Sequence, residues 1–201
     1  MRKGILFVMT APSGAGKTTL LGGLLEEVPG LVYSVSVTTR PPRRGEADGR
    51  SYHFTTRAEF ETMLAAGEFL EHAVVYDHYY GTRRSVIEKA LAAGKDIILD
   101  IDVRGALQVM EKGYPGVFVY IMPPSMRELE RRLRGRATDA EEVIRKRLSL
   151  AREEMGYAGR YDYIVVNDRL AVARGELKSI IVAERQRAAR NADLIRRIAG
   201  K

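Results

Sequence analysis

Residues 5–18 read Ile-Leu-Phe-Val-Met-Thr-Ala-Pro-Ser-Gly-Ala-Gly-Lys-Thr, an apolar run followed by a glycine-containing turn. The apolar run is typical of a buried strand, and a turn ending in Gly-Lys-Thr is typical of a phosphate-binding loop. Its glycines let successive backbone N–H groups point at one phosphate, and a helix beginning near Gly16 directs its positive dipole end at the same anion. Lys17 supplies a charge for the outer phosphates, and the Thr18 hydroxyl is suited to binding Mg²⁺. These residues predict a nucleoside triphosphate site.

The loop departs from the usual pattern at one position. Ala11 stands where the pattern G-x-x-x-x-G-K-[ST] has its first glycine. Alanine would be strained there if the backbone needed a positive φ, and would cost little if the residue simply ends the strand. An accidental glycine-rich turn is the alternative, but strand, Gly-Lys-Thr and helix follow in the order that a phosphate loop requires.

Length, charge and composition limit the class of protein. The 201 residues suffice for one domain, or for one domain with insertions. The net charge of +7 fits a nucleic-acid-binding protein, but it also fits an enzyme whose arginines hold several phosphates. The lack of cysteine excludes a disulfide framework and a thiolate metal site, and it agrees with a cytoplasmic protein. No apolar run is long enough for a membrane span, so we expect no membrane partner.

Strands and helices alternate along most of the chain. Short apolar runs predict strands over residues 5–9, 96–101, 117–122 and 163–166. Helices are predicted over residues 17–27, 103–112, 126–134 and 140–154, and from residue 171 towards the C-terminus. Ser125 should cap the helix over 126–134, with Glu128 completing a capping box. The alternation predicts an α/β fold of the P-loop NTPase type, with a parallel sheet flanked by helices on both faces.

Two segments interrupt this alternation. Residues 33–80 are rich in Thr, Tyr, Phe and Val with Pro and Gly turn signals, which predicts short antiparallel strands and a helix near residues 57–66. Residues 135–142 form a glycine-containing stretch between two helices. We interpret the first segment as an inserted substrate module and the second as part of a flexible lid. Residues 188–201 predict an amphipathic terminal helix that packs on the domain or supports oligomerisation.

Two polar features outside the loop are candidates for the site. Asp100 and Asp102 end the strand predicted at 96–101, where ligands bind in open α/β sheets, so one of them can hold Mg²⁺; a solvated turn is the alternative. Arg40 and Arg43 flank a rigid Pro-Pro pair, and with Tyr52 they can clamp a second phosphate. Taken alone, the segment 38–54 reads better as a polar hairpin with solvated arginines.

That segment resembles the signature of guanylate kinases. The signature is T-[ST]-R, a basic residue three positions on, an acidic residue three further, then Gly and Tyr-x-[FY]. The matching residues are Thr38, Thr39, Arg40, Arg43, Glu46, Gly49, Tyr52 and Phe54. The phosphate loop, Tyr79-Tyr80-Gly81, the Ile-Leu-Asp-Ile-Asp strand, Pro123-Pro124-Ser125 and Val166-Asn167-Asp168 are also similar to that family and follow in its order.

The resemblance implies an enzyme that transfers the γ-phosphoryl group of ATP to GMP, and also to dGMP, with Mg²⁺ as cofactor, in purine nucleotide metabolism. It implies one domain over residues 1–201, with a core (1–35, 84–124 and 160–201), an inserted mixed α+β GMP-binding module (36–83) and a small helical lid (125–159). The ATP-binding residues it implies are Ala11, Pro12, Ser13, Gly14, Ala15, Gly16, Lys17, Thr18, Thr19 and Asn167. The GMP-binding residues it implies are Ser36, Arg40, Arg43, Glu46, Tyr52, Glu71, Tyr80, Gly81, Thr82 and Asp102. The metal ligands would be Thr18 and Asp100, and the catalytic residues Lys17, Arg43, Arg132, Arg136 and Arg147.

The chemistry of guanine agrees with these positions. A carboxylate such as Glu71 can accept from N1–H and N2–H₂, and a hydroxyl such as Ser36 or Thr82 can donate to O6. Adenine would leave these groups unpaired, which gives strong discrimination. Without the resemblance, Glu71 would read as a solvated charge, and Arg131 and Arg134 read equally well as a solvated basic face.

Two other functions compete with a kinase of GMP. One is a catalytically silent guanylate-kinase-like module that binds proteins, against which the intact Lys17-Thr18 pair and the full set of arginines argue. The other is a nucleic-acid-dependent ATPase, against which the complete segment 38–54 argues. We therefore expect ATP and GMP as partners and no nucleic acid.

Overall fold

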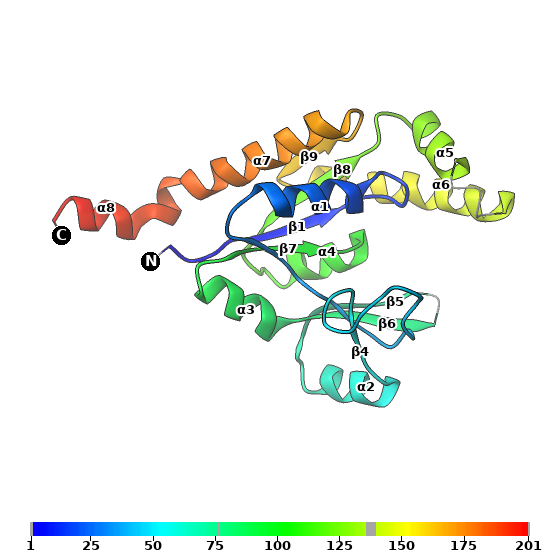
Figure 1. The fold of residues 1–201 in the computed structure, drawn as a ribbon, viewed down its shortest axis with the longest axis horizontal. Coiled ribbons are helices and arrows are strands. Elements are labelled where there is room, and N and C mark those ends of the chain that lie inside the picture. Colours follow the sequence, from blue (N-terminus) through cyan, green and yellow to red (C-terminus); the bar gives the residue numbers. More distant parts are fainter. Residues whose placement is uncertain (1, 76, 136–139, 201) are drawn as a thin grey trace.

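The computed structural model describes residues 2–75, 77–135 and 140–200. Its larger sheet contains five parallel strands in the order β2-β7-β1-β8-β9 (Figure 1). The central strand β1 is buried along its whole length because helices cover both faces, which explains its continuous apolar sequence. The predicted α/β fold is therefore confirmed, although residues 31–33 were not predicted as a strand of this sheet. The strands are β1 (Leu6–Thr10), β2 (Leu31–Tyr33), β7 (Asp96–Asp100), β8 (Val117–Met122) and β9 (Tyr163–Val166).

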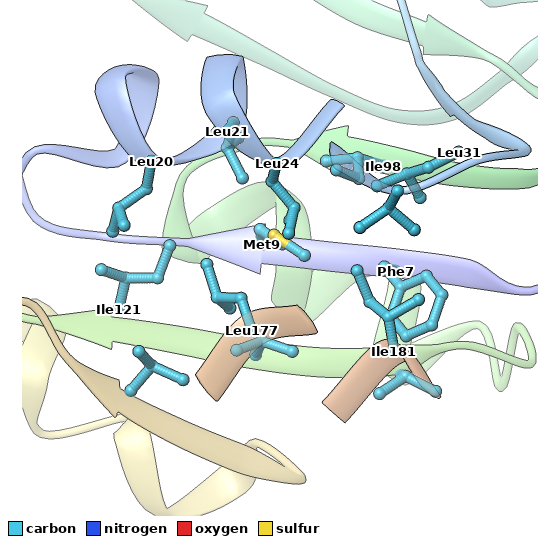
Figure 2. Close-up of a cluster of buried hydrophobic side chains, with 14 of the residues drawn as sticks. Phe7, Met9, Leu20, Leu21, Leu24, Leu31, Ile98, Ile121, Leu177 and Ile181 are labelled. Atoms are coloured by element: carbon cyan, nitrogen blue, oxygen red, sulfur yellow. The ribbon is translucent and has the colours of Figure 1, made fainter. Parts of the chain in front are cut away.

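Alternate side chains of the sheet enter two separate cores, as the two-residue period of a strand requires. Phe7 and Met9 of β1 pack with Leu20 and Leu24 of α1 and with α7 (Figure 2). Leu6 and Val8 belong to the opposite core, which α3 and α4 cover. The helices that flank the sheet are α1 (Lys17–Glu27), α3 (Arg84–Ala92), α4 (Val103–Glu111) and α7 (Leu170–Gln186).

A second, four-stranded sheet has the order β4-β3-β6-β5 and lies below α4 in Figure 1. Strands β3 and β6 pair antiparallel, as do β5 and β6, but β3 and β4 run parallel, so the prediction of antiparallel strands was wrong for that pair. The connection over residues 39–52 is long enough for the crossover that parallel strands require. The elements are β3 (Val37–Thr38), β4 (His53–Phe54), α2 (Arg57–Ala65), β5 (Phe69–Val75) and β6 (His78–Arg83).

Helices α5 (Met126–Arg134) and α6 (Glu141–Met155) pack together through a small core around Leu129, Leu133 and Leu148. Ser125 caps α5 by accepting from the Glu128 backbone N–H at 3.1 Å. The predicted capping box is incomplete, because the Glu128 carboxylate instead binds the guanidinium groups of Arg131 and Arg132. A full capping box occurs at α2, between Thr56 and Glu59, where the sequence analysis did not place one.

The C-terminal region is not one continuous helix. Helix α7 ends at Gln186, a 3₁₀ turn follows over Ala188–Asn191, and α8 covers Ala192–Ile198. Arg187 breaks the helix by adopting a ψ of 128°. Helix α8 buries none of its residues, so the apolar side chains predicted to pack on the domain are exposed, Ile198 to 77%. No described helix combines the length and the apolar character that crossing a bilayer demands.

A buried carboxylate joins distant parts of the chain at the end of the sheet where β1 begins. Asp96 has no exposed surface, and it accepts from Arg2, from the Ile5 backbone N–H and from Arg185 at 2.9, 2.9 and 2.6 Å. The attraction of two cations and the hydrogen bond from a backbone donor offset the free-energy cost of removing this charge from water. The nucleotide-site candidates lie at the opposite, carboxyl ends of the strands, which leaves that edge open for ligands.

Candidate functional site

The predicted phosphate loop joins the end of β1 to the start of α1. Gly14 and Gly16 have φ values of 94° and 88°, which favour glycine. A Cβ atom on Gly16 would also lie 2.5 Å from Nδ2 of Asn167. Ala11 is not among the described residues with positive φ, and it packs against the core, so the alanine there causes no strain. The loop therefore needs its later glycines but not a glycine at residue 11.

Asn167, the residue directly after β9, supports this loop. Its buried side-chain Nδ2 donates to the Ala15 carbonyl at 2.7 Å, and its backbone carbonyl accepts from Arg132 at 2.9 Å. Asn167 and Arg132 line a cavity of about 460 Å³ together with Gly14, Gly16 and Thr19. The structure thus brings the predicted ATP residue Asn167 and the predicted catalytic residue Arg132 to the loop.

Lys17 reaches from the start of α1 to the end of β7. Its ammonium group donates to the Ile101 carbonyl at 3.0 Å and forms an ion pair with Asp100. Asp100 also accepts from the Tyr33 hydroxyl at 3.2 Å. Burial, and after it the charge and the hydrogen bond of Asp100, hold the pKa of Tyr33 far above its usual range. The Lys17 charge is therefore held next to the loop by a carboxylate.

A divalent cation would find two hard oxygen donors here. Thr18 is exposed at the first turn of α1. Asp100 forms an ion pair with Lys17, the residue that precedes Thr18 in the sequence. Within residues 2–75, 77–135 and 140–200, no group of three or more acidic, His or Cys side chains could hold a metal alone. This donor set fits Mg²⁺, which is usually bound by one or two protein oxygens plus water and substrate phosphates.

Five of the predicted GMP-binding residues line one cavity of about 310 Å³ between the two sheets. They are Ser36, Tyr52, Glu71, Tyr80 and Asp102, and Asp100 lines the same cavity. This cavity therefore shares Asp100 with the Lys17 ion pair of the loop. Gly81 is not among the lining residues, because it is buried against Phe69 and Phe60.

Glu71 is the buried carboxylate of this cavity, with 4% of its surface exposed. Burial raises its pKa to about 7, and the Asp102 charge acts in the same direction. Thr82 donates its hydroxyl proton to Oε1 of Glu71 at 2.5 Å, and a hydroxyl has one proton to donate. Of the two hydroxyls considered for guanine O6, only that of Ser36 is therefore unused by Glu71.

Arg40 lies at the edge of the same cavity and is 8% exposed. Its guanidinium group binds both Glu46 oxygens at 2.8 and 2.9 Å, donates to the Tyr80 hydroxyl at 3.2 Å and lies over the Tyr52 ring. The Glu46 hydrogen bond raises the pKa of Arg40, so this group stays charged. Four predicted residues thus form one preassembled cluster, in which the charges of Arg40 and Glu46 compensate each other.

The remaining predicted arginines outside the loop and the cluster are Arg43, Arg147 and Arg136. Arg43 is exposed, and only its backbone N–H joins the cluster, by donating to Glu46 at 2.8 Å. Arg147 is half-buried on α6. Arg136 lies outside the described residues.

Glu154, near the end of α6, is a charged residue that the sequence analysis missed. It is half-buried, and burial raises its pKa to about 7, with the charges of Asp102 and Lys17 acting in opposite directions. Its carboxylate is therefore within electrostatic range of both Lys17 and Asp102. Its sequence context, Arg-Glu-Glu-Met, is that of any solvated helix, so no sequence signal could have found it.

Comparison with known proteins identifies a family for this chain. The family model described as guanylate kinase matches residues 3–184. The chain is 49% identical over 187 residues to a guanylate kinase of Desulfitobacterium hafniense, covering 93% of this chain and 94% of that one. It is 47% identical over 197 residues to one of Caldanaerobacter subterraneus, covering 98% and 96%. The crystal structure of guanylate kinase from Anaplasma phagocytophilum is similar with a TM-score of 0.77 and 34% identity, covering 97% and 95%.

Proposed function

Because the chain belongs to the guanylate kinase family, we propose that it transfers the γ-phosphoryl group of ATP to GMP, giving ADP and GDP. The observation that carries this proposal is the cavity lined by Ser36, Glu71 and Asp102, which meets the phosphate loop at Asp100. A donor nucleotide on the loop and an acceptor in the cavity would face each other at this point. We further propose that dGMP is an acceptor and that the enzyme acts in the cytoplasm.

The acceptor base is guanine because the cavity offers matching hydrogen-bonding groups. The ionised Glu71 accepts from N1–H and N2–H₂, and Ser36 donates to O6. Adenine would present an acceptor to the Glu71 carboxylate and leave buried groups unpaired, which costs roughly 1–3 kcal/mol for each. The low exposure of Glu71 supports this role, since water cannot replace the missing partners.

The acceptor phosphate binds the cluster of Arg40, Tyr52 and Tyr80, with Arg43 closing on it from the exposed side. A guanidinium group has five N–H donors, and Arg40 uses four of them for Tyr80, the Pro41 carbonyl and the two Glu46 oxygens, so one N–H remains for a phosphate oxygen. This arrangement is preassembled, so little side-chain entropy is lost on binding.

Catalysis is alignment and charge neutralisation, because phosphoryl transfer needs little covalent help from the protein. Lys17 exchanges Asp100 for the β and γ phosphates, and Arg132, Arg136 and Arg147 add positive charge from the lid over residues 125–159. Mg²⁺, held by Thr18 and Asp100, would neutralise charge on the transferring phosphoryl group. The core is residues 1–35, 84–124 and 160–201, and residues 36–83 form the GMP-binding module.

A coupled assay of ADP formation tests this function. Mg-ATP is supplied with GMP, dGMP, AMP, UMP or no acceptor. GMP should give much faster ADP formation than AMP or UMP. Equal turnover of AMP and GMP would contradict the base-reading role of the cavity, and a lack of any acceptor-dependent ADP would favour a silent binding module.

A further inference from the structure

One face of helix α4 lies against strand β5 next to the predicted guanine-reading carboxylate. Gly105, Gln108 and Lys112 are spaced by three and four residues, so they lie on the same side of the helix and of its C-terminal cap. None of the three lines the cavity, and no sequence motif singled them out. The contacts that they make with β5 fall on Leu70, Glu71 and His72, which are consecutive, and Glu71 is the central one.

Gln108 holds the backbone on one side of Glu71. Its side-chain Nε2 donates to the His72 carbonyl at 2.7 Å, and its Oε1 accepts from the His72 N–H at 3.2 Å. The amide thereby binds both backbone groups of one residue, as a neighbouring strand does in a sheet.

Lys112 holds the backbone on the other side. Its ammonium group donates to the Leu70 carbonyl at 2.6 Å. The Lys112 charge also acts on the Glu71 carboxylate and favours its ionised form. The strand is therefore fixed to the helix immediately before and immediately after Glu71.

Gly105 allows the carboxylate itself to approach the helix. A Cβ atom on this residue would lie 2.8 Å from Oε2 of Glu71 and 3.4 Å from Oδ1 of Asp102. The Glu71 carboxylate has little room to move away, because it is 4% exposed and Thr82 holds its other oxygen. Gly105 lies inside a helix and has no positive φ, so the backbone conformation does not require glycine there. The close approach of Glu71 is what requires it.

We propose that Gly105, Gln108 and Lys112 are positioning residues that hold the Glu71 carboxylate in place for guanine, and so set the affinity and base selectivity for the acceptor nucleotide. This inference rests on the proposed function, because it assigns these residues to the same acceptor site. The competing explanation is that the three residues only fasten the second sheet to the core. The two explanations differ in what each substitution does to stability and to GMP binding.

Gly105→Ala distinguishes the positioning role from the fastening role. Alanine stabilises a helix interior relative to glycine, so this substitution should not lower the unfolding temperature through the helix itself. Gly175→Ala in α7 is the matched control, since among the described residues no heavy atom beyond its own stretch of helix lies within 4 Å of its Cβ position. We expect Gly105→Ala to raise the GMP Kd, measured by calorimetry, roughly tenfold or more, because the buried carboxylate loses its alignment. The ATP KM and the control's GMP Kd should stay unchanged. An unchanged GMP Kd in a folded Gly105→Ala protein would overturn the proposal.

A second pair of variants keeps the test independent of Gly105. Lys112→Met removes the hydrogen bond and the charge, whereas Lys112→Arg keeps both. The charged groups that act on Glu71 are Lys112 and Asp102, and only Lys112 favours the ionised carboxylate. The pH at which GMP binding weakens should therefore move upwards in Lys112→Met and stay near the wild-type value in Lys112→Arg. Identical pH profiles in all three proteins would contradict the proposal.

The wild-type protein separates failure of this inference from failure of the proposed function. If the wild-type protein binds and phosphorylates GMP and all of these variants behave like it, only the positioning role of α4 is contradicted. A wild-type protein that neither binds nor phosphorylates GMP would remove both.

Discussion

The phosphate loop and the cavity around Glu71 are built in opposite ways. The loop consists of consecutive residues, and its shape depends on glycine conformations at Gly14 and Gly16. The cavity is assembled from side chains that lie far apart in the sequence. Its polar groups include the buried charge of Glu71, and the buried charge of Arg40 lies at its edge. The backbone of the loop offers donors to any phosphate, whereas side chains in the cavity can distinguish one base from another.

This difference predicts that damage to the two regions should have opposite kinetic signatures. Substitutions at the loop should lower turnover with little effect on the acceptor. Substitutions in the cavity should weaken the acceptor with little effect on ATP. The four predictions below begin with the largest expected effect.

Lys17→Met should lower kcat by roughly 10²–10³, because a positive charge is lost where charge is redistributed in the transition state. The GMP Kd, measured by calorimetry, should change less than threefold or so, since GMP binds the other region. A variant with normal turnover and a large loss of GMP affinity would reverse the assignment of the two regions.

Arg147→Ala should lower kcat by roughly tenfold to a hundredfold and raise the KM for GMP by much less, because its charge should act in the closed, reacting complex. Arg145→Ala, an exposed residue on the same helix, is the control. Steady-state kinetics on both variants decides the matter. Wild-type kcat in Arg147→Ala would remove this arginine from the catalytic set.

Glu71→Gln keeps the size of the side chain but replaces one acceptor oxygen with a donor. The KM for GMP should rise roughly tenfold, because a lost partner in a buried site costs about 1–3 kcal/mol. The KM for ATP should barely move, and Glu68→Gln, an exposed neighbour, should behave like the wild type. An unchanged GMP KM would mean that Glu71 does not read the base.

The same variant should show a pH-dependent change in stability. The pKa of Glu71 is about 7 in the folded protein and about 4.5 in an unfolded chain, so the folded state binds more protons between these values. The free energy of unfolding therefore falls as the pH rises through this window. Glu71→Gln should be more stable than the wild type at pH 8, by roughly 1–3 kcal/mol, and similar to it at pH 4. Urea unfolding at both pH values measures this, and equal stability at pH 8 would contradict the raised pKa.

The sequence allowed the phosphate loop and most of the parallel sheet to be predicted because their signals are local. Residues 5–18 contain the strand, the glycines and the lysine in one stretch, and the helix over 17–27 was placed at its observed bounds. The cavity has no such local signal. Glu71 lies in a strand among ordinary residues, and only the resemblance to guanylate kinases brought it into the predicted site.

What could not be predicted depends on contacts between distant segments. Glu154 acquires its environment from Asp102 and Lys17, which are far from it in the chain. The contact between Gly105 and Glu71 likewise exists only after α4 has packed on β5. The break at Arg187 was also missed, because the apolar residues of 188–201 have helical spacing and therefore gave no sign that the helix ends at Gln186.

The buried Asp96 has a consequence for the order in which the chain can fold. Its partners Arg2 and Arg185 are 94 and 89 residues away, so nearly the whole polypeptide must be synthesised before both cations are present. A nascent chain that lacks Arg185 would have to bury this carboxylate with only one of its two cationic partners. Burying a charge that is incompletely paired costs free energy in an apolar interior. The native arrangement of the central strands is thus favoured only once α7 has been made, and the long sequence separation of these contacts slows the search for it.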